Sequence, residues 1–100
     1  MRRIISRKAL LTFSEHHADA KDALDAWYNE ARKADWRTPQ DVKETYRDAS
    51  IIGDNRVVFN IKGNNYRLIV HIEYKFSIVH IKWTGTHRDY DDTDAETIGR

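Results

Sequence analysis

The sequence of 100 residues contains no cysteine and only one proline. The absence of cysteine excludes a disulfide framework, a thiolate nucleophile and any zinc site that needs thiolate ligands. It also agrees with a reducing compartment, so we expect a cytoplasmic protein. No apolar run approaches the length of a membrane span, and Arg7 and Lys8 interrupt the start of the chain where a signal peptide needs an apolar segment. We therefore expect no export and no membrane contact.

The composition also lacks the bias of a disordered chain. Hydrophobic residues make up 40% of the sequence and charged residues 33%, which is typical of a folded protein. A chain of 100 residues buries a modest core. We therefore expect a single domain that spans residues 1–100.

The whole chain has almost no net charge, only +1, but the charges are distributed unevenly. Residues 56–88 carry six basic side chains and one acidic one, which gives a local net charge of +5. Residues 89–100 carry five acidic side chains and one arginine, which gives −4. The basic stretch is able to attract a polyanion, and the acidic tail is able to shield it or compete with it. The alternative is a solvated face beside a solvated tail.

Apolar residues at intervals of three and four predict helices in the first half of the chain. Thr38 is a candidate N-cap with Pro39 at the first helical position and Asp41 in the first turn. Ile4 and Ile5 indicate a short strand near the start. The predicted helices begin at Ser6, Asp19 and Thr38-Pro39 and end near His16-His17, Ala34 and Tyr46.

Three β-rich runs, 56–62, 66–74 and 76–84, follow the break at Gly53-Asp54-Asn55 and predict an antiparallel meander. A two-residue turn within Gly63-Asn64-Asn65, centred on either pair, keeps the apolar positions on one face. A tight connection around Tyr74-Lys75 would set Val70 opposite Val79 and Leu68 opposite Ile81. The predicted fold class is α+β, with N-terminal helices packed on one face of a small, mainly antiparallel sheet.

Alternation of side chains assigns the residues of this sheet to two faces. The face expected to form the core holds Val57, Phe59, Ile61, Tyr66, Leu68, Val70, Ile72, Val79, Ile81 and Trp83. The opposite face holds Asn60, Lys62, Arg67, His71, His80 and Lys82. Three cations and two imidazoles on one face predict a phosphate-binding surface. The alternative is an ordinary solvent-facing side of an antiparallel sheet.

Cleavage of RNA without a metal needs a base for the 2′-hydroxyl, cations for the phosphorane and an acid for the leaving oxygen. His87 is the first candidate for proton transfer, because imidazole exchanges protons near neutral pH. Arg67 is a candidate to hold the phosphate and Lys62 a candidate base, while Tyr90 follows close behind His87. Each of these side chains also has a purely structural alternative, as a surface residue or as packing at the sheet edge.

Several other chemistries are not supported by the sequence. His71 and His80 lack the further imidazole or carboxylate ligands that a zinc site needs, so we expect no metal. The chain contains no P-loop, zincin motif, serine nucleophile elbow or paired-carboxylate signature. Common nucleotide hydrolysis is therefore not expected.

Two blocks carry a resemblance to a known family: Asn60-Ile61-Lys62-Gly63-Asn64-Asn65-Tyr66-Arg67, and Gly85-Thr86-His87 with Tyr90-Asp91. Together with Arg3-Ile4-Ile5-Ser6, Trp27-Tyr28, Trp36 and Thr38-Pro39, they resemble the HigB toxins over nearly the whole chain. The resemblance implies a RelE-like fold whose active site lies on the sheet face opposite the helices. It implies ribosome-dependent cleavage of mRNA without a cofactor.

The resemblance also implies partners and site residues. The expected partner is HigA, a helix-turn-helix antitoxin. We expect the toxin to contact operator DNA only through this antitoxin. The implied catalytic residues are Lys62, Arg67, His87 and Tyr90, and we add Asn60, Asn64, Lys82 and Arg88 as candidate RNA contacts. Which residue is the base and which the acid stays open. The competing hypotheses are a non-catalytic module that binds nucleic acid or protein through the basic face, and a subunit whose β-edge accepts another chain.

Overall fold

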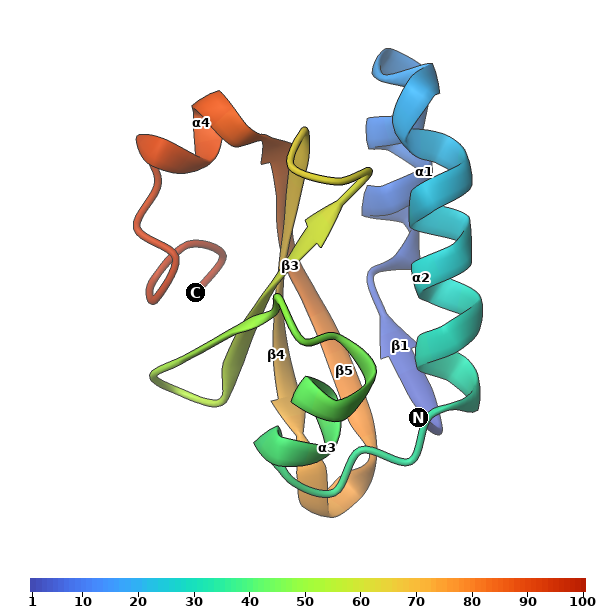
Figure 1. Ribbon diagram of the computed structural model, residues 1–100, viewed down its shortest axis with the longest axis vertical. Coiled ribbons are helices and arrows are strands. Elements are labelled where there is room, and N and C mark those ends of the chain that lie inside the picture. The colour runs from blue at the N-terminus through green and yellow to red at the C-terminus, as the bar shows by residue number, and fades with distance from the viewer.

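The computed structural model describes all 100 residues as a five-stranded sheet with helices on both sides (Figure 1). The strands are β1 (Arg3–Ile5), β2 (Ser50–Ile52), β3 (Arg56–Ile61), β4 (Tyr66–Glu73) and β5 (Ile78–Thr86). The helices are α1 (Arg7–His16), α2 (Lys21–Lys33), α3 (Pro39–Thr45) and α4 (His87–Asp91), with 3-10 turns at Ala18–Ala20 and Tyr74–Phe76. The strand order is β1-β5-β4-β3-β2, and only the β1–β5 pair is parallel. The predicted α+β class is confirmed.

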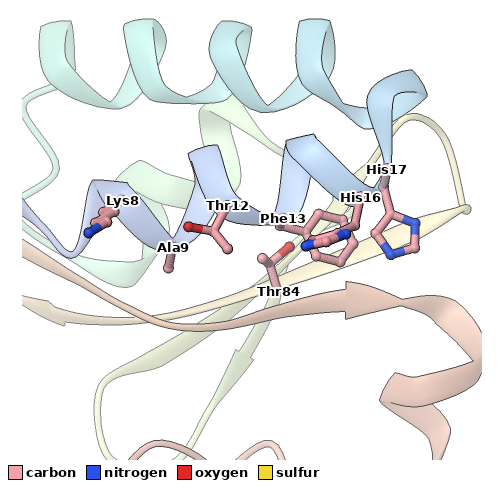
Figure 2. Close-up of a pocket in the computed structure, with 7 residues that line it drawn as sticks. All are labelled: Lys8, Ala9, Thr12, Phe13, His16, His17 and Thr84. Atoms are coloured by element: carbon pink, nitrogen blue, oxygen red, sulfur yellow. The ribbon is translucent and has the colours of Figure 1, made fainter.

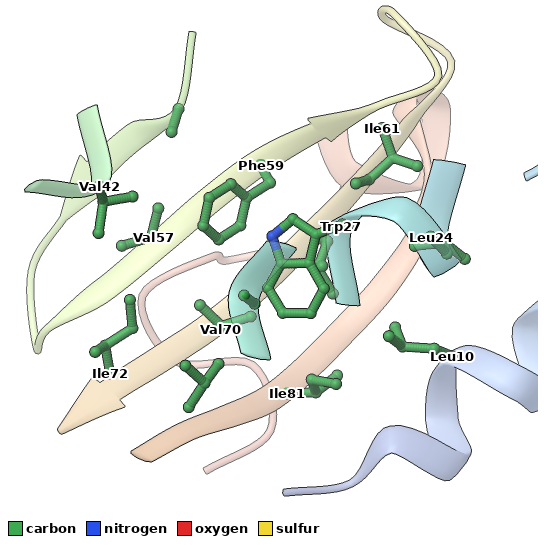
Figure 3. Close-up of a cluster of buried hydrophobic side chains, with 14 of the residues drawn as sticks. Leu10, Leu24, Trp27, Val42, Val57, Phe59, Ile61, Val70, Ile72 and Ile81 are labelled. Atoms are coloured by element: carbon green, nitrogen blue, oxygen red, sulfur yellow. The ribbon is translucent and has the colours of Figure 1, made fainter. Parts of the chain in front are cut away.

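The three N-terminal helices cover one face of this sheet, and α4 lies on the opposite side (Figure 1). Figure 2 shows α1 between α2 and β5. The core fills the space between the helices and the sheet (Figure 3), where Trp27 of α2 packs edge-on against Phe59 of β3 with ring centroids 5.4 Å apart. No helix has both the length and the apolar character needed to cross a membrane.

The helix boundaries follow the local signals with two differences. Thr38 is the N-cap of α3, as predicted, and it forms a capping box with Asp41, in which each side chain accepts a backbone N–H of the other residue. Ser6 lies where α1 begins, but its φ is 74° and its side chain makes no capping bond, so its predicted capping role is wrong. The helix expected from Asp19 starts as a 3-10 turn and becomes α-helical at Lys21.

The β3–β4 hairpin has the predicted register, and its turn is centred on Gly63-Asn64. Asn65 donates its backbone N–H to the Lys62 carbonyl at 3.3 Å, and Ile61 lies opposite Tyr66. The positive φ values fall on Lys62 (52°) and Gly63 (64°). The left-handed conformation of Lys62 redirects its side chain, with consequences for the site described below.

The predicted register of β4 and β5 is wrong by two residues. The connection is a 3-10 turn followed by Ser77 at φ 59°, so it is longer than the tight turn expected from the sequence. Val70 therefore lies opposite Ile81 rather than Val79. A bulge then leaves Lys82 without a partner and sets Trp83 opposite Ile69. Trp83 thus lies on the face away from the helices, and its predicted place in the core is also wrong.

The C-terminal tail covers part of the outer sheet face. Arg56, 1% exposed, donates to the backbone carbonyls of Ala95 (3.1 Å) and Ile98 (2.6 Å). Val58 and Ile69, which point to this face, are buried. The tail therefore shields a basic residue, as the charge distribution suggested, but through backbone carbonyls rather than through its carboxylates. Neither β2 nor α4 was expected from the sequence.

We expect Leu68→Ala to lower the free energy of unfolding by about 2–5 kcal/mol, because Leu68 is fully buried and its truncation leaves a cavity. The matched control is Leu11→Ala on α1, since Leu11 is 43% exposed. Urea denaturation monitored by tryptophan fluorescence measures both variants. Equal losses in the two variants would contradict the assigned core.

Candidate active site

The β3–β4 turn, the start of β4 and the first residue of α4 meet at one end of the sheet, and the Asn64 carbonyl links them. This oxygen accepts hydrogen bonds from the Arg67 guanidinium at 3.2 Å and from the His87 ring nitrogen Nδ1 at 3.2 Å. The backbone N–H of His87 also donates to the Asn65 carbonyl at 3.0 Å. The turn therefore holds a guanidinium and an imidazole in fixed positions beside each other.

Arg67 is almost buried, with 9% of its surface exposed. Its guanidinium also donates to the Asn64 side-chain oxygen at 2.5 Å and to the Tyr66 carbonyl at 3.2 Å. The guanidinium lies 5.6 Å from the centre of the Tyr90 ring, within the range of a cation–π contact. Arg67 therefore contributes both a fixed positive charge and a structural brace between the turn and α4.

The hydrogen bond to Asn64 determines the tautomer of His87. A carbonyl oxygen only accepts, so Nδ1 must carry the proton, and in the neutral ring Nε2 has the free lone pair. The His87 side chain is 42% exposed, so this lone pair is accessible to a substrate. Asp91, one turn along α4, places a carboxylate oxygen 3.6 Å from Nε2. This arrangement suits a general base, with an accessible imidazole nitrogen and a carboxylate beside it.

Tyr90 and Trp83 form an aromatic cover beside Arg67, with ring centroids 6.4 Å apart. The indole of Trp83 lies over Gly85, which is opposite Arg67 in the sheet. A Cβ atom at residue 85 would overlap the indole ring, so only glycine leaves room for it. Trp83 and Gly85 therefore belong to this site, although sequence reasoning placed Trp83 in the core and gave Gly85 no role.

Lys62 points toward the helices and away from the polar face on which it was predicted. Its ammonium forms an ion pair with Asp19, just before α2, at 3.0 Å. The other oxygen of Asp19 accepts from the Tyr66 hydroxyl at 2.5 Å. These contacts, from Tyr66 first and Lys62 second, hold the pKa of Asp19 below its usual range. The bond to Asp19 in turn raises the pKa of Tyr66.

The remaining candidates are spread over the outer face. Asn60 lies opposite Arg67, but its amide donates to the Asp48 carboxylate at 3.1 Å. Lys82 is the bulged residue of β5, with its carbonyl next to Gly99 in the tail. Arg88 is exposed on α4. The structure thus brings Asn64, Arg67, His87 and Tyr90 together and places the other four around them.

His71 and His80 lie opposite each other farther along the outer face, with ring centroids 5.7 Å apart. The Glu73 carboxylate is 2.5 Å from His80 Nε2, and this contact lowers the pKa of Glu73. Burial lowers the pKa of His71. No group of three or more histidines and carboxylates lies close enough together to hold a metal ion.

Comparison with known proteins gives consistent matches. A family model described as HigB toxin, the RelE-like toxic component of a toxin–antitoxin system, matches residues 20–93. The mRNA interferase toxin HigB of Escherichia coli strain K12 is 27% identical over 90 residues, which cover 88% of this chain and 86% of the relative. The mRNA interferase HigB proteins of Escherichia coli O157:H7 and Shigella flexneri match to the same extent. The matched range contains all eight candidate site residues.

We expect Asp19→Asn to remove the contribution to the free energy of unfolding that the ionised Asp19 makes and that is lost in acid. A carboxyl whose pKa is lowered by folding stabilises the protein above its unfolded value, 3.8, and this contribution disappears as the pH falls through the folded value. The difference in unfolding free energy between wild type and Asp19→Asn should be constant above about pH 5 and shrink below the unfolded pKa. Urea titrations across this range measure it. A difference that grows at low pH would contradict the assignment.

Proposed function

The chain belongs to the HigB toxin family, and we propose that this toxin is an mRNA endoribonuclease that acts through the Arg67 and His87 site. The observation that supports this most directly is the Asn64 carbonyl shared by the two side chains. It fixes the tautomer of a solvent-accessible imidazole beside a guanidinium that has a constant charge. A base next to a fixed cation is what attack by a 2′-hydroxyl on a phosphodiester requires.

In the proposed reaction, His87 Nε2 removes the proton from the 2′-hydroxyl, and that oxygen forms a bond to the adjacent phosphorus. The bond from phosphorus to the 5′-oxygen breaks, and this leaving oxygen takes a proton from the Tyr90 hydroxyl. The charges of Arg67 and the exposed Arg88 stabilise the phosphorane. Lys62 adds positive charge at the rim, although its ammonium is shared with Asp19. The products are a 2′,3′-cyclic phosphate and a 5′-hydroxyl.

The toxin's partners follow from the same family. A toxin–antitoxin system supplies an antitoxin, and we propose a HigA-like helix-turn-helix protein that also connects the toxin to operator DNA. The proposed substrate is mRNA on the ribosome, and the proposed compartment is the cytoplasm. One domain of 100 residues would carry both the cleavage site and the antitoxin surface. A non-catalytic module that binds through its basic face is the alternative that the cleavage assay below tests.

We favour inhibition by exclusion, in which the antitoxin binds away from the site and makes the complex too bulky for the ribosome. The alternative is an acidic plug, in which an acidic segment of the antitoxin covers Lys62 and Arg67. The structure offers such a plug little free charge, because Arg67 is nearly buried and Lys62 is paired with Asp19. A contact on the helices or on a sheet edge avoids this limitation.

We expect His87→Ala to reduce cleavage of mRNA by translating ribosomes by about 10²–10⁴-fold, the usual contribution of a general base. Its melting temperature should change little, since the side chain is partly exposed. Arg67→Ala should lower both cleavage and stability, because it removes a brace that is almost buried. Gel analysis of the RNA and thermal unfolding measure the two effects.

End-group analysis of the same products tests the reaction itself. A 2′,3′-cyclic phosphate and a 5′-hydroxyl are expected, whereas a 5′-phosphate would show that water is the nucleophile. No cleavage by well-folded wild-type protein, with or without ribosomes, would favour the binding module. Full cleavage by His87→Ala would remove the residue from its proposed role.

Antitoxin affinity distinguishes exclusion from a plug. Under exclusion, the double variant Lys62→Ala/Arg67→Ala should bind the antitoxin as wild type does, with little change between low and high salt, because apolar contacts are not screened. Calorimetric titration at two salt concentrations measures both. A large drop in affinity in the double variant would overturn exclusion, provided that circular dichroism shows the variant folded.

A further inference from the structure

The largest cavity of the molecule lies outside the site described above, along the seam between α1 and β5. It is an open groove of about 640 Å³ lined by Lys8, Ala9, Thr12, Phe13, His16, His17 and Thr84 (Figure 2). We propose that this groove binds the stretch of single-stranded mRNA that flanks the cleaved bond. The proposal rests on the endoribonuclease function proposed above and extends it to a second contact surface.

One wall of the groove is a polar stripe on α1. Lys8, Thr12 and His16 are spaced four residues apart, so they lie along one side of the helix, and all three are exposed. At 1.5 Å per residue the stripe is about 12 Å long, which accommodates a few nucleotides. An ammonium, a hydroxyl and an imidazole are groups that donate hydrogen bonds to phosphate and ribose oxygens.

The floor of the groove is aromatic. The rings of Phe13 and His17 are stacked, with centroids 4.3 Å apart and an angle of 21° between their planes. His17 is only half-buried, so the stacked pair offers a partly exposed aromatic surface at the His16 end of the groove (Figure 2). Unpaired bases stack on such rings without requiring a particular sequence.

The groove and the active site meet at the same end of the sheet. His17 contacts the edge of Tyr66, with centroids 5.6 Å apart, and Tyr66 lies opposite Thr86, the residue before His87. Thr84 donates its hydroxyl to the Arg67 carbonyl at 3.1 Å. An RNA strand that passes over this end of the sheet can therefore reach both the His87 imidazole and the groove.

The chemistry of the lining favours RNA over a protein segment. No carboxylate lines this groove, whereas Glu15 of α1 lies in a separate one together with the exposed Leu11. Leu11, the exposed large apolar side chain of α1, lies outside the groove that holds Phe13. The ammonium of Lys8 instead complements the charge of a phosphate, to which the imidazoles can donate hydrogen bonds.

The test measures binding of RNA that cannot be cleaved, with deoxyribose at the position of the attacking 2′-hydroxyl. Two oligonucleotides are compared by fluorescence anisotropy: a short one that covers only the cleaved bond and a longer one with flanking nucleotides. The groove variant is Lys8→Ala/His16→Ala, and His17→Ala tests the aromatic surface. The matched control is Lys75→Ala, which removes one lysine from the β4–β5 connection at the opposite end of the sheet.

We expect the groove variant to bind the longer RNA about tenfold more weakly and to reduce the salt slope of log K by about 0.7 for each phosphate that the variant no longer neutralises. Affinity for the short RNA should not change, and Lys75→Ala should bind both as wild type does. His17→Ala should weaken binding of the longer RNA and leave binding of the short RNA unchanged. Melting temperatures show that each variant is folded.

Other results would overturn the inference. These are unchanged affinity for the longer RNA, equal weakening for both RNAs, or the same weakening in Lys75→Ala. Weaker antitoxin binding with unchanged RNA affinity would show that the groove receives a protein. If groove-dependent binding is found but wild-type protein cleaves no RNA, the proposed endoribonuclease function fails and the RNA surface remains.

Discussion

The short turn between β3 and β4 is the constraint on which the rest of the site depends, because it is held from both sides of the sheet. Lys62, at its start, is tied to Asp19 beside the helices. Asn64, at its centre, binds Arg67 and His87 on the other side. The left-handed conformation of Lys62 makes this division possible, since it turns one side chain toward the helical layer. A displacement of the turn would therefore alter the imidazole, the guanidinium and the ion pair together.

A β-bulge determines the second half of the site. With a regular β5, Trp83 would point into the core together with Val79 and Ile81; the unpaired Lys82 moves it to the outer face instead. There the indole needs the space left by Gly85 and contacts Tyr90, which lies over the Arg67 guanidinium. The single extra residue thus converts a core aromatic into a wall of the site.

The sequence was sufficient to predict features that local interactions determine. It was insufficient where one extra residue in a strand or turn changes which side chains face the core. The Thr38 N-cap and the β3–β4 register were predicted correctly because short-range hydrogen bonds and alternation specify them. The β4–β5 register failed because a 3-10 turn and a bulge leave no reliable periodic signal. Asp19 was unpredictable as a site neighbour, since 43 residues separate it from Lys62. Arg67, His87 and Tyr90 lie close together, as expected from their places near the ends of adjacent elements, and their roles in the site stay predictions.

Burial reduces the positive charge that residues 56–88 present to solvent. Arg56 and Arg67 are each less than one-tenth exposed and bind backbone carbonyls, so the local charge of residues 56–88 overstates the charge available to a phosphate. A buried guanidinium that braces two segments cannot leave its partners without disrupting the structure. RNA binding at this site therefore needs accessible groups in addition to Arg67, whose charge acts on the phosphorane from a nearly buried position. Contacts on α1 would meet this requirement, because Lys8 is exposed there and no carboxylate lines its groove.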